Sequence, residues 1–392
     1  MKPKLFSAPN LYLVLWALYY TQGFLLPQGT FISRLVLLIY LSVSLYYVFY
    51  ANIEFKLNGY FKVFNVLILM FTVYGLADVF IYNFGKIVLP SRTVNSFDYL
   101  KLIYLSLLPT YAFYAFTRKQ LVDETWIKRA FFLCFGVMVV QYVVYLNRIK
   151  DSFEDEAMQT INVGYEFISL IPMVFFFRKR PVLQYVLLTI IYMIVISTVK
   201  RGAIFTGAIC LVYFIYATLS NASRRSRWFV IPIVLFFLFF GSRYVSQFYE
   251  NSEYAQLRME QTLEGNSSGR DVIFGNAWDT FIKSNFLQLA FGQGAHGTIK
   301  SMGIMAHNDW LELLVNQGLF GVFLYLCYWL AFYVDFRRNK DPNTRPIMGI
   351  IVLALFVSSW FSFSYGSMYL PMNLCLGYCL AEQQLVKKVD SN

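Results

Sequence analysis

A succession of long apolar runs constrains this sequence more than any other feature. A helix that crosses a bilayer needs about 20 mostly apolar residues, because hydrocarbon offers no partners to unpaired backbone groups. Several runs in the chain reach that length. The sequence therefore predicts an all-α, polytopic integral membrane protein with about twelve transmembrane helices. We expect these spans near residues 9–26, 31–50, 61–82, 98–116, 129–147, 162–177, 181–199, 202–220, 228–243, 309–335, 346–364 and 367–385.

Composition agrees with this fold class and argues against a nucleic-acid partner. Hydrophobic residues make up 58% of the 392 residues and charged residues only 14%, whereas roughly a quarter of a soluble domain is charged. The formal net charge is +11, but the basic residues lie in short loops between apolar runs and form no groove-sized patch. No internal repeat or soluble domain is visible, so residues 1–392 are expected to form a single membrane domain.

The cysteines give no sign of a disulfide or a metal site. All five lie inside apolar runs, and none has the spacing to histidine that a metal site needs. We therefore expect no disulfide and no bound metal. Separately, no cofactor is expected. The five are Cys134, Cys210, Cys327, Cys375 and Cys379.

Lysine and arginine in the short loops predict the orientation, because they concentrate on the cytoplasmic side. With a cytoplasmic N-terminus, the inner loops hold most of the basic residues, and the outer loop at 148–163 holds four acidic ones. Both termini are then cytoplasmic, and residues 244–308 form a large periplasmic loop. Apolar residues recur at helical spacing over 274–282, which predicts an amphipathic helix in that loop.

Several charged residues break this pattern, and they gather toward the outer side. Ionisable groups at membrane depth cost several kcal/mol unless paired or hydrated, so they indicate a site or a water-filled cavity. Arg34 and Asp78 could instead form a structural ion pair, and Lys200 could simply extend to the interface. The set is Lys200 and Arg201 in a tight turn, Arg34, Asp78 and Glu166 near the ends of spans, and Arg243, Arg258 and Arg270 in the outer loop.

Arginine suits phosphate, because its planar and permanently charged fork matches the oxygens. His307 stands before Asn308, a good N-cap for a helix whose N-terminus would face outward and favour an anion. A histidine there can act as a general base or a hydrogen-bond donor, although it could also only cap the helix. Asp309 and Glu312 could replace it as base, or could merely cap and solvate the helix.

Two neighbours of this motif have simpler expected roles. Trp310 is expected to anchor the chain at the membrane interface, where tryptophan is enriched. His296 lies between Gly294 and Gly297 and is expected to be an ordinary loop residue.

Taken together, these motifs resemble the O-antigen ligase and O-antigen polymerase superfamily of bacterial inner-membrane glycosyltransferases. The resemblance covers the region from Ser197 to Gly321, and the rest of the chain matches only in topology. The motifs are Ser197-x-x-x-Arg201-Gly202-Ala203, Ser268-Gly269-Arg270, Gly292-x-Gly294, His307-Asn308-Asp309-x-Leu311-x-x-Leu314 and Gly318-Leu319-x-Gly321.

The resemblance implies a metal-independent glycosyltransferase with an undecaprenyl-diphosphate-linked glycan as donor and a glycan or lipid A–core as acceptor. It implies catalytic roles for Arg201, Arg270 and His307 on the periplasmic side, contact with membrane lipids, and a chain-length regulator as a further partner. Lys200 departs from the family pattern, which more often has a small polar residue there. The predicted substrate-binding residues are Lys200, Arg34, Asp78, Asn308, Asp309, Glu312 and Arg258.

Three functions remain open at this level. An O-antigen polymerase, which joins lipid-linked repeat units, is favoured by the divergent spans rich in Phe and Tyr. An O-antigen ligase, which transfers the glycan to lipid A–core, shares the same donor. A transporter of lipid-linked oligosaccharide is a more distant alternative, because it would carry broken or charged helices near the bilayer midplane rather than charges at the outer end.

Overall fold

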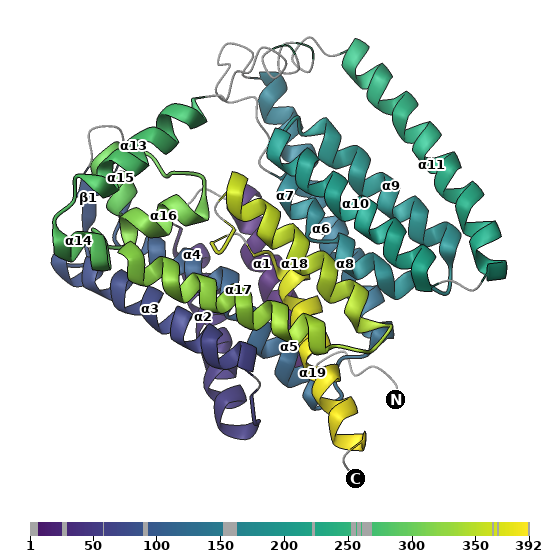
Figure 1. Ribbon diagram of the computed structural model, residues 1–392, viewed down its shortest axis with the longest axis horizontal. Helices are drawn as coiled ribbons and strands as arrows, with labels where there is room; N and C mark the ends of the chain where they lie inside the picture. Colours follow the sequence, from purple (N-terminus) through teal and green to yellow (C-terminus); the bar gives the residue numbers. More distant parts are fainter. Residues whose placement is uncertain are drawn as a thin grey trace.

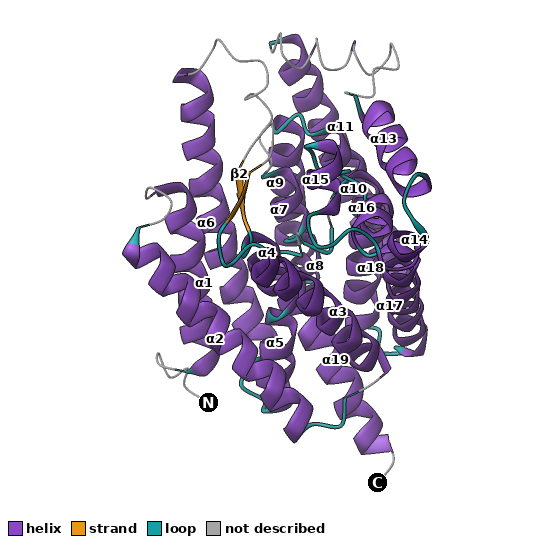
Figure 2. Ribbon diagram, turned by 90° about the vertical axis from the view of Figure 1, so that its left-hand side faces the viewer, coloured by secondary structure: helices purple, strands orange, loops and turns teal. Residues whose placement is uncertain are grey.

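The computed structural model describes residues 7–25, 30–57, 59–88, 93–151, 163–221, 224–251, 256, 260, 269–362, 364–366 and 368–390. Nearly all regular structure in this part of the chain is helical, and the helices pack in a broad bundle (Figures 1 and 2). The sheet consists of β1 (Lys86–Val88) and β2 (Thr93–Asn95), an antiparallel hairpin that pairs Ile87 with Val94. The predicted all-α fold is confirmed.

The helices of the N-terminal part coincide with the expected apolar runs. The run at 98–116 forms two helices end to end rather than one, because Pro109 lacks the N–H that a continuous helix would use. A proline at the first position of a helix leaves no bond unmade. The helices are α1 (Ala8–Leu25), α2 (Phe31–Glu54), α3 (Gly59–Ile81), α4 (Asp98–Leu107), α5 (Pro109–Arg118) and α6 (Glu124–Asp151).

The run expected to span the membrane at 162–177 is broken into short pieces. These are α7 (Gly164–Ile168), α8 (Ile171–Val174) and the 3₁₀ helix η2 (Phe175–Phe177). Every residue from Val163 to Phe177 is buried. Irregular backbone at membrane depth is tolerated only where protein covers it, so the interior position of this segment explains why it need not be one helix.

The C-terminal part contains the remaining helices. The span expected at 309–335 is divided at Gly318, whose φ is +67°. A Cβ there would lie 2.6 Å from backbone atoms of Ala290 and Gly292, so this turn requires glycine. The helices are α9 (Pro181–Ser197), α10 (Arg201–Asn221), α11 (Arg224–Glu250), α13 (Arg270–Ile282), α14 (Phe286–Phe291), α15 (Gly297–Met302), α16 (Asp309–Asn316), α17 (Gly318–Arg338), α18 (Thr344–Phe361) and α19 (Leu370–Asp390).

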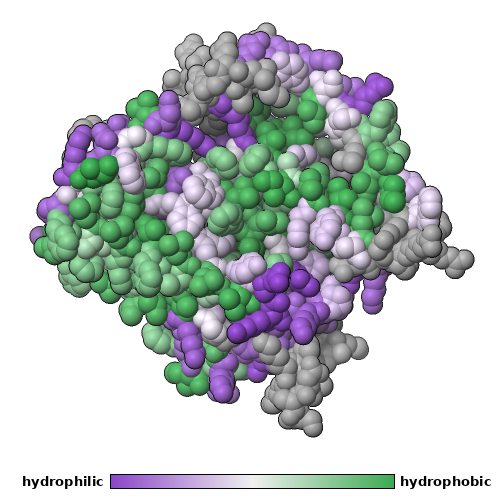
Figure 3. Space-filling model, in the orientation of Figure 1, coloured by the Kyte–Doolittle hydropathy of each residue, from purple (hydrophilic) through white to green (hydrophobic). Residues whose placement is uncertain are grey.

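The surface identifies the chain as a membrane protein. Six described helices, namely α2, α3, the first 24 residues of α6, α10, α17 and α18, are long and apolar enough to cross a bilayer. Many of their large apolar side chains face outward; Phe49, for example, is 65% exposed. Figure 3 shows a broad hydrophobic band with hydrophilic residues along its edges. The expected number of twelve spans and the orientation of the termini stay predictions.

Helix α19 lies against α5 in the middle of the bundle. Gly377 allows this close approach, because a Cβ there would lie 2.6 Å from the carbonyl oxygen of Thr110. Asn373 fixes the contact by accepting a 2.5 Å hydrogen bond from Thr110 and donating to Ser106. The segment that joins α18 to α19 is thereby held inside the bundle, next to the residues described below.

Candidate active site

The backbone around Arg201 lies at the C-terminal end of α18. Arg201 is the first residue of α10 and is half-buried. A Cβ on the next residue, Gly202, would lie 3.2 Å from Cβ of Phe361 and 2.2 Å from the hydroxyl oxygen of Tyr165. Any side chain at Gly202 would clash, so this glycine lets the start of α10 approach both α7 and α18.

His307 meets the same end of α18. Its neighbour Asn308 donates a 3.3 Å hydrogen bond from Nδ2 to the carbonyl oxygen of Trp360. His307 itself is exposed between two buried neighbours, Ala306 and Asn308. Its φ is +52°, a left-handed conformation that is unfavourable for any residue with a Cβ. Strain of this kind persists where the surrounding structure imposes it, and here it turns the imidazole outward.

Arg270 approaches the group from a third helix. It is the first residue of α13, after Gly269 with φ of +74°. Its guanidinium is close enough to the Tyr165 hydroxyl to act on it electrostatically. Tyr165 also lines a small cavity with Ser362 and therefore lies between Arg270 and the start of α10. The segments that carry the three predicted catalytic residues thus meet around Tyr165 and the end of α18.

The N-terminus of α16 is capped as predicted, but it is not an open anion site. Oδ1 of Asn308 accepts hydrogen bonds from the backbone N–H groups of Trp310 (3.0 Å) and Leu311 (3.1 Å). The first turn also contains two buried carboxyl groups, on Asp309 and Glu312. The N–H groups of Trp310 and Leu311 are therefore used by Asn308 and are not left for a substrate anion.

Glu312 binds the loop before His307 rather than replacing His307 as a base. Its carboxylate is buried and accepts hydrogen bonds from Oγ1 of Thr298 (2.5 Å), the backbone N–H of Ala306 (2.7 Å) and Nδ2 of Asn316 (3.0 Å). One of these donors is the residue directly before His307. Glu312 is therefore a positioning residue that fixes the approach to the histidine.

Removing the Glu312 carboxylate is expected to destabilise the loop before His307 and so to lower the thermal midpoint of unfolding. Glu312→Ala leaves three donors without an acceptor, and each buried unsatisfied group costs about 1–3 kcal/mol. We expect the thermal midpoint in detergent to fall in the order wild type, Glu312→Gln, Glu312→Ala, because glutamine keeps one of the two acceptor oxygens. Asp279→Ala is the matched control, since that carboxylate lies on the surface and pairs with exposed Lys283. Equal midpoints for wild type and Glu312→Ala would refute this role.

Asp78 anchors the same loop from α3. It is buried, and its carboxylate binds Nδ1 of His296 at 2.7 Å and Nζ of Lys300 at 2.9 Å. Arg34 lies exposed on α2, so the alternative of an Arg34–Asp78 ion pair is wrong. His296 was expected to be an ordinary loop residue, but it is buried with this carboxylate. Both groups therefore hold the loop that leads to His307.

Asp309 joins α16 to the segment between α18 and α19. It is buried and accepts hydrogen bonds from the backbone N–H of Ser364 at 2.8 Å, from the Ser364 hydroxyl and from the Tyr325 hydroxyl at 2.7 Å. Burial raises the pKa of Asp309 to about 7, although these hydrogen bonds oppose the shift. The carboxyl group is enclosed by protein donors, so it holds the segment in place rather than serving as an alternative base.

The raised pKa of Asp309 makes stability depend on pH. The folded protein keeps the Asp309 proton up to about pH 7, whereas the unfolded chain releases it near the ordinary pKa of 3.8. The folded state therefore binds more protons in this window, and stability falls as pH rises through it. We expect the thermal midpoint of the wild type to decrease between about pH 5 and 7 relative to Asp309→Asn. Parallel curves for the two proteins would contradict this assignment.

The remaining predicted residues, Lys200, Arg258 and Trp310, lie in different environments or outside the described residues. Lys200 is half-buried in the turn between α9 and α10, where Val199 has φ of +52°. Arg258 lies outside the described residues. Trp310, expected as an interfacial anchor, is half-buried. Its Nε1–H donates to Ser359 at 3.2 Å, and its ring lies 5.7 Å from that of Trp360.

Residues of the segment between α18 and α19 were missed by sequence reasoning. Ser364 binds Asp309, and Ser362 lies with Tyr165 beside the site. They carry no charge and belong to no motif, so the sequence gives no signal for them. Tyr165 was missed for the same reason, because its position depends on the close approach of Gly202.

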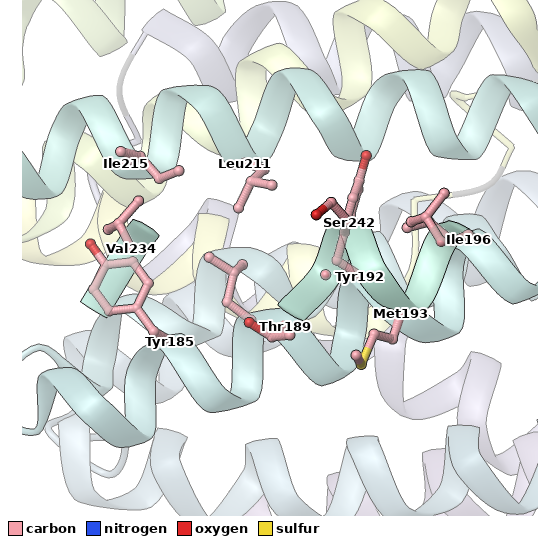
Figure 4. Close-up of a pocket in the computed structure, with 12 residues that line it drawn as sticks. Tyr185, Thr189, Tyr192, Met193, Ile196, Leu211, Ile215, Val234 and Ser242 are labelled. Carbon is pink, nitrogen blue, oxygen red and sulfur yellow. The ribbon is translucent and has the colours of Figure 1, made fainter. Parts of the chain in front are cut away.

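An apolar slot of about 230 Å³ runs between α9, α10 and α11 (Figure 4). Tyr185 and Ile196 line it from α9, and Leu211, Val234 and other apolar side chains line it from the facing helices. From Tyr185 to Ile196 the helix rises roughly 16 Å. Ile196 stands just before the turn that leads to Arg201, so the slot ends near this cation.

One comparison with known proteins covers the segments that carry the three predicted catalytic residues. The sequence model of a family described as O-antigen ligase matches residues 185–326, a range that includes Arg201, Arg270 and His307. A search among curated proteins gives no match. The family match indicates a membrane glycosyltransferase-like enzyme of the O-antigen ligase or polymerase type. Residues 185–326 are thus similar to this family, which is consistent with a member of the superfamily of O-antigen ligases and O-antigen polymerases.

Proposed function

We propose that the chain is an O-antigen polymerase that transfers glycan from an undecaprenyl-diphosphate-linked donor to a lipid-linked repeat unit. The observation that carries the proposal is the meeting of three segments, which begin with Arg201, with Arg270 and with exposed His307, around the end of α18. Two guanidinium groups and an imidazole suit a reaction in which a diphosphate leaves and a hydroxyl group attacks.

The donor lipid has a suitable place beside this cluster. A polyprenyl chain is apolar and fits the slot between α9, α10 and α11. Its diphosphate would then lie at the Lys200–Arg201 turn, where the slot ends. Arginine binds phosphate oxygens through paired N–H donors, and Lys200 adds a point charge.

The proposed reaction exchanges one bond at the anomeric carbon of the donor. The bond from this carbon to the diphosphate oxygen breaks, and a bond to the acceptor oxygen forms. His307 takes the proton of the attacking hydroxyl. Arg201 and Arg270 stabilise the negative charge that develops on the leaving diphosphate, and this preorganised positive charge makes a metal ion unnecessary.

The basic loops favour an orientation in which this site faces the periplasm and both termini are cytoplasmic. A lipid-linked donor would then reach the enzyme in the outer leaflet of the bacterial inner membrane. A chain-length regulator is the further partner that a polymerase would need to limit its product.

Reconstitution with one substrate tests the proposal. The purified protein is placed in vesicles with the lipid-linked repeat unit alone. A polymerase lengthens the glycan and releases undecaprenyl diphosphate without any other acceptor. Wild-type protein that yields neither product, with folding verified by its thermal midpoint, would refute the polymerase assignment.

An O-antigen ligase is the second candidate, because the matching family is described by that name. A ligase would use the same donor and the same leaving group but would transfer the glycan to lipid A–core. Deletion of the gene separates the two functions. Lipid A–core that keeps a single repeat unit indicates a polymerase, and lipid A–core without any repeat unit indicates a ligase.

A further inference from the structure

A second cavity, of about 260 Å³, lies between α1, α2, α4, α6 and the start of α19. We name it the aromatic cavity after Trp16, Tyr19, Tyr20, Tyr40 and Tyr369, which line it. Helices α1 and α2 lie away from α11 in both Figures 1 and 2, so this cavity and the apolar slot belong to different parts of the bundle.

Four of these aromatic rings form two pairs. The ring centroids of Trp16 and Tyr20 are 5.0 Å apart, and those of Tyr19 and Tyr40 are 5.8 Å apart with nearly parallel planes. The Tyr20 hydroxyl donates to Oε1 of buried Gln141, so this ring has a fixed orientation. A tyrosine presents an apolar face and a polar tip. The wall of the cavity thus offers both flat apolar surfaces and hydroxyl groups.

One acidic side chain lies near the aromatic cavity without lining it. The Asp98 carboxylate, at the start of α4, is close enough to the Tyr19 hydroxyl to act on it electrostatically. Asp98 also binds Nζ of Lys101 at 2.8 Å and is partly exposed. The tyrosine hydroxyl groups of the lining and the nearby carboxylate offer polar partners that a hydrocarbon chain could not use, since apolar ligands form no hydrogen bonds.

The segment between α18 and α19 connects this cavity to the candidate active site. Tyr369 lines the aromatic cavity and also the small cavity shared with Tyr165 and Ser364. Met368 likewise lines the aromatic cavity and the space beside Ser364. Ser364 binds Asp309, which lies two residues after His307. A ligand in the aromatic cavity would therefore lie one layer of side chains from the site.

We propose that the aromatic cavity binds a pyranose ring of the acceptor saccharide. A pyranose has an apolar face of C–H groups and an edge of hydroxyl groups, which match the rings and hydroxyl groups of Trp16, Tyr19 and Tyr20. This inference rests on the proposed function, because it names the acceptor of that reaction. The apolar slot is assigned to the donor lipid, so the attacking hydroxyl group of the acceptor must reach the site from another side. An acceptor saccharide bound in the aromatic cavity would approach the site from such a side.

Binding of a free saccharide tests the inference. The probe is the repeat-unit saccharide released from its lipid by mild acid, and the signal is the tryptophan fluorescence of purified protein. Wild type should show a saturable change that Trp16→Phe removes. Tyr19→Leu should bind about tenfold more weakly, a loss of about 1.4 kcal/mol, whereas Tyr19→Phe keeps the ring and loses less. Tyr46→Leu on the exposed face of α2 is the matched control and should bind like wild type.

Kinetics separate this inference from the proposed function. In the transfer assay, Tyr19→Leu should raise KM for the acceptor and leave kcat near that of the wild type. Wild-type transfer combined with unchanged saccharide binding in Tyr19→Leu would overturn the inference and leave the proposed function standing. Competition by polyprenyl phosphate for the fluorescence change would also overturn it, because the cavity would then hold lipid. Folded wild-type protein that transfers no glycan would refute the proposed function itself.

Discussion

Replacing His307 with alanine is expected to slow glycan transfer by about 10²- to 10⁴-fold, which is the usual contribution of a general base. The thermal midpoint should stay close to that of the wild type, because the imidazole is exposed and its neighbours carry the packing. Initial rates are to be measured with purified protein and lipid-linked repeat unit, at saturating concentration. A general base acts on the chemical step, so kcat should fall far more than KM rises.

The second histidine is the matched control for this variant. His296 is buried and bound to Asp78, so His296→Ala should lower the thermal midpoint. At a temperature at which it is still folded, it should retain more transfer than His307→Ala. The reverse order of activities, or a His307→Ala variant as active as wild type, would contradict the assignment of the base to His307.

Replacing either Arg201 or Arg270 with alanine is expected to lower kcat by about 10²- to 10³-fold, since each removes a preorganised donor to developing negative charge. Arg201→Lys and Arg270→Lys should each recover part of the loss, because lysine keeps the charge but not the planar fork. The assay is the release of undecaprenyl diphosphate under the same conditions. The control is a variant that lacks a different positively charged side chain of the predicted periplasmic loop.

Lys283→Ala is that control, because Lys283 is exposed on the same loop and pairs with Asp279. It should transfer glycan at the wild-type rate. If all three alanine variants lose activity equally, the effect is one of general surface charge. If Arg201→Ala and Arg270→Ala retain full activity, the two arginines do not bind the diphosphate.

The positions of the long apolar helices could be predicted from the sequence because each depends on a local property, namely an apolar run of sufficient length. The cap on α16 was also local, since Asn308 stands directly before the helix that it caps. The division between α16 and α17 could not be predicted in this way. It depends on Gly318 meeting the backbone of Ala290 and Gly292, which is a contact between distant parts of the chain.

For the candidate site, too, local sequence motifs could be predicted, whereas contacts between distant parts of the chain could not. Arg201, Arg270 and His307 stand in recognisable motifs, so the amino-acid sequence alone is enough to select them. The partner of Asp78 could not be selected in this way, because His296 lies 218 residues away in the sequence. Charge alone suggested Arg34, which has the right sign and lies at the end of a span. The actual partner is His296, because the buried Asp78 carboxylate needs hydrogen-bond donors at bonding distance.

The most direct test of the central claim is the affinity of purified protein for a polyprenyl diphosphate and for the corresponding monophosphate, measured without an acceptor. The account predicts that the wild type and His307→Ala bind the diphosphate more tightly than the monophosphate. Arg201→Ala and Arg270→Ala should each bind the diphosphate at least about tenfold more weakly, a loss of about 1.4 kcal/mol. Diphosphate affinities in these two variants equal to that of the wild type would contradict the account.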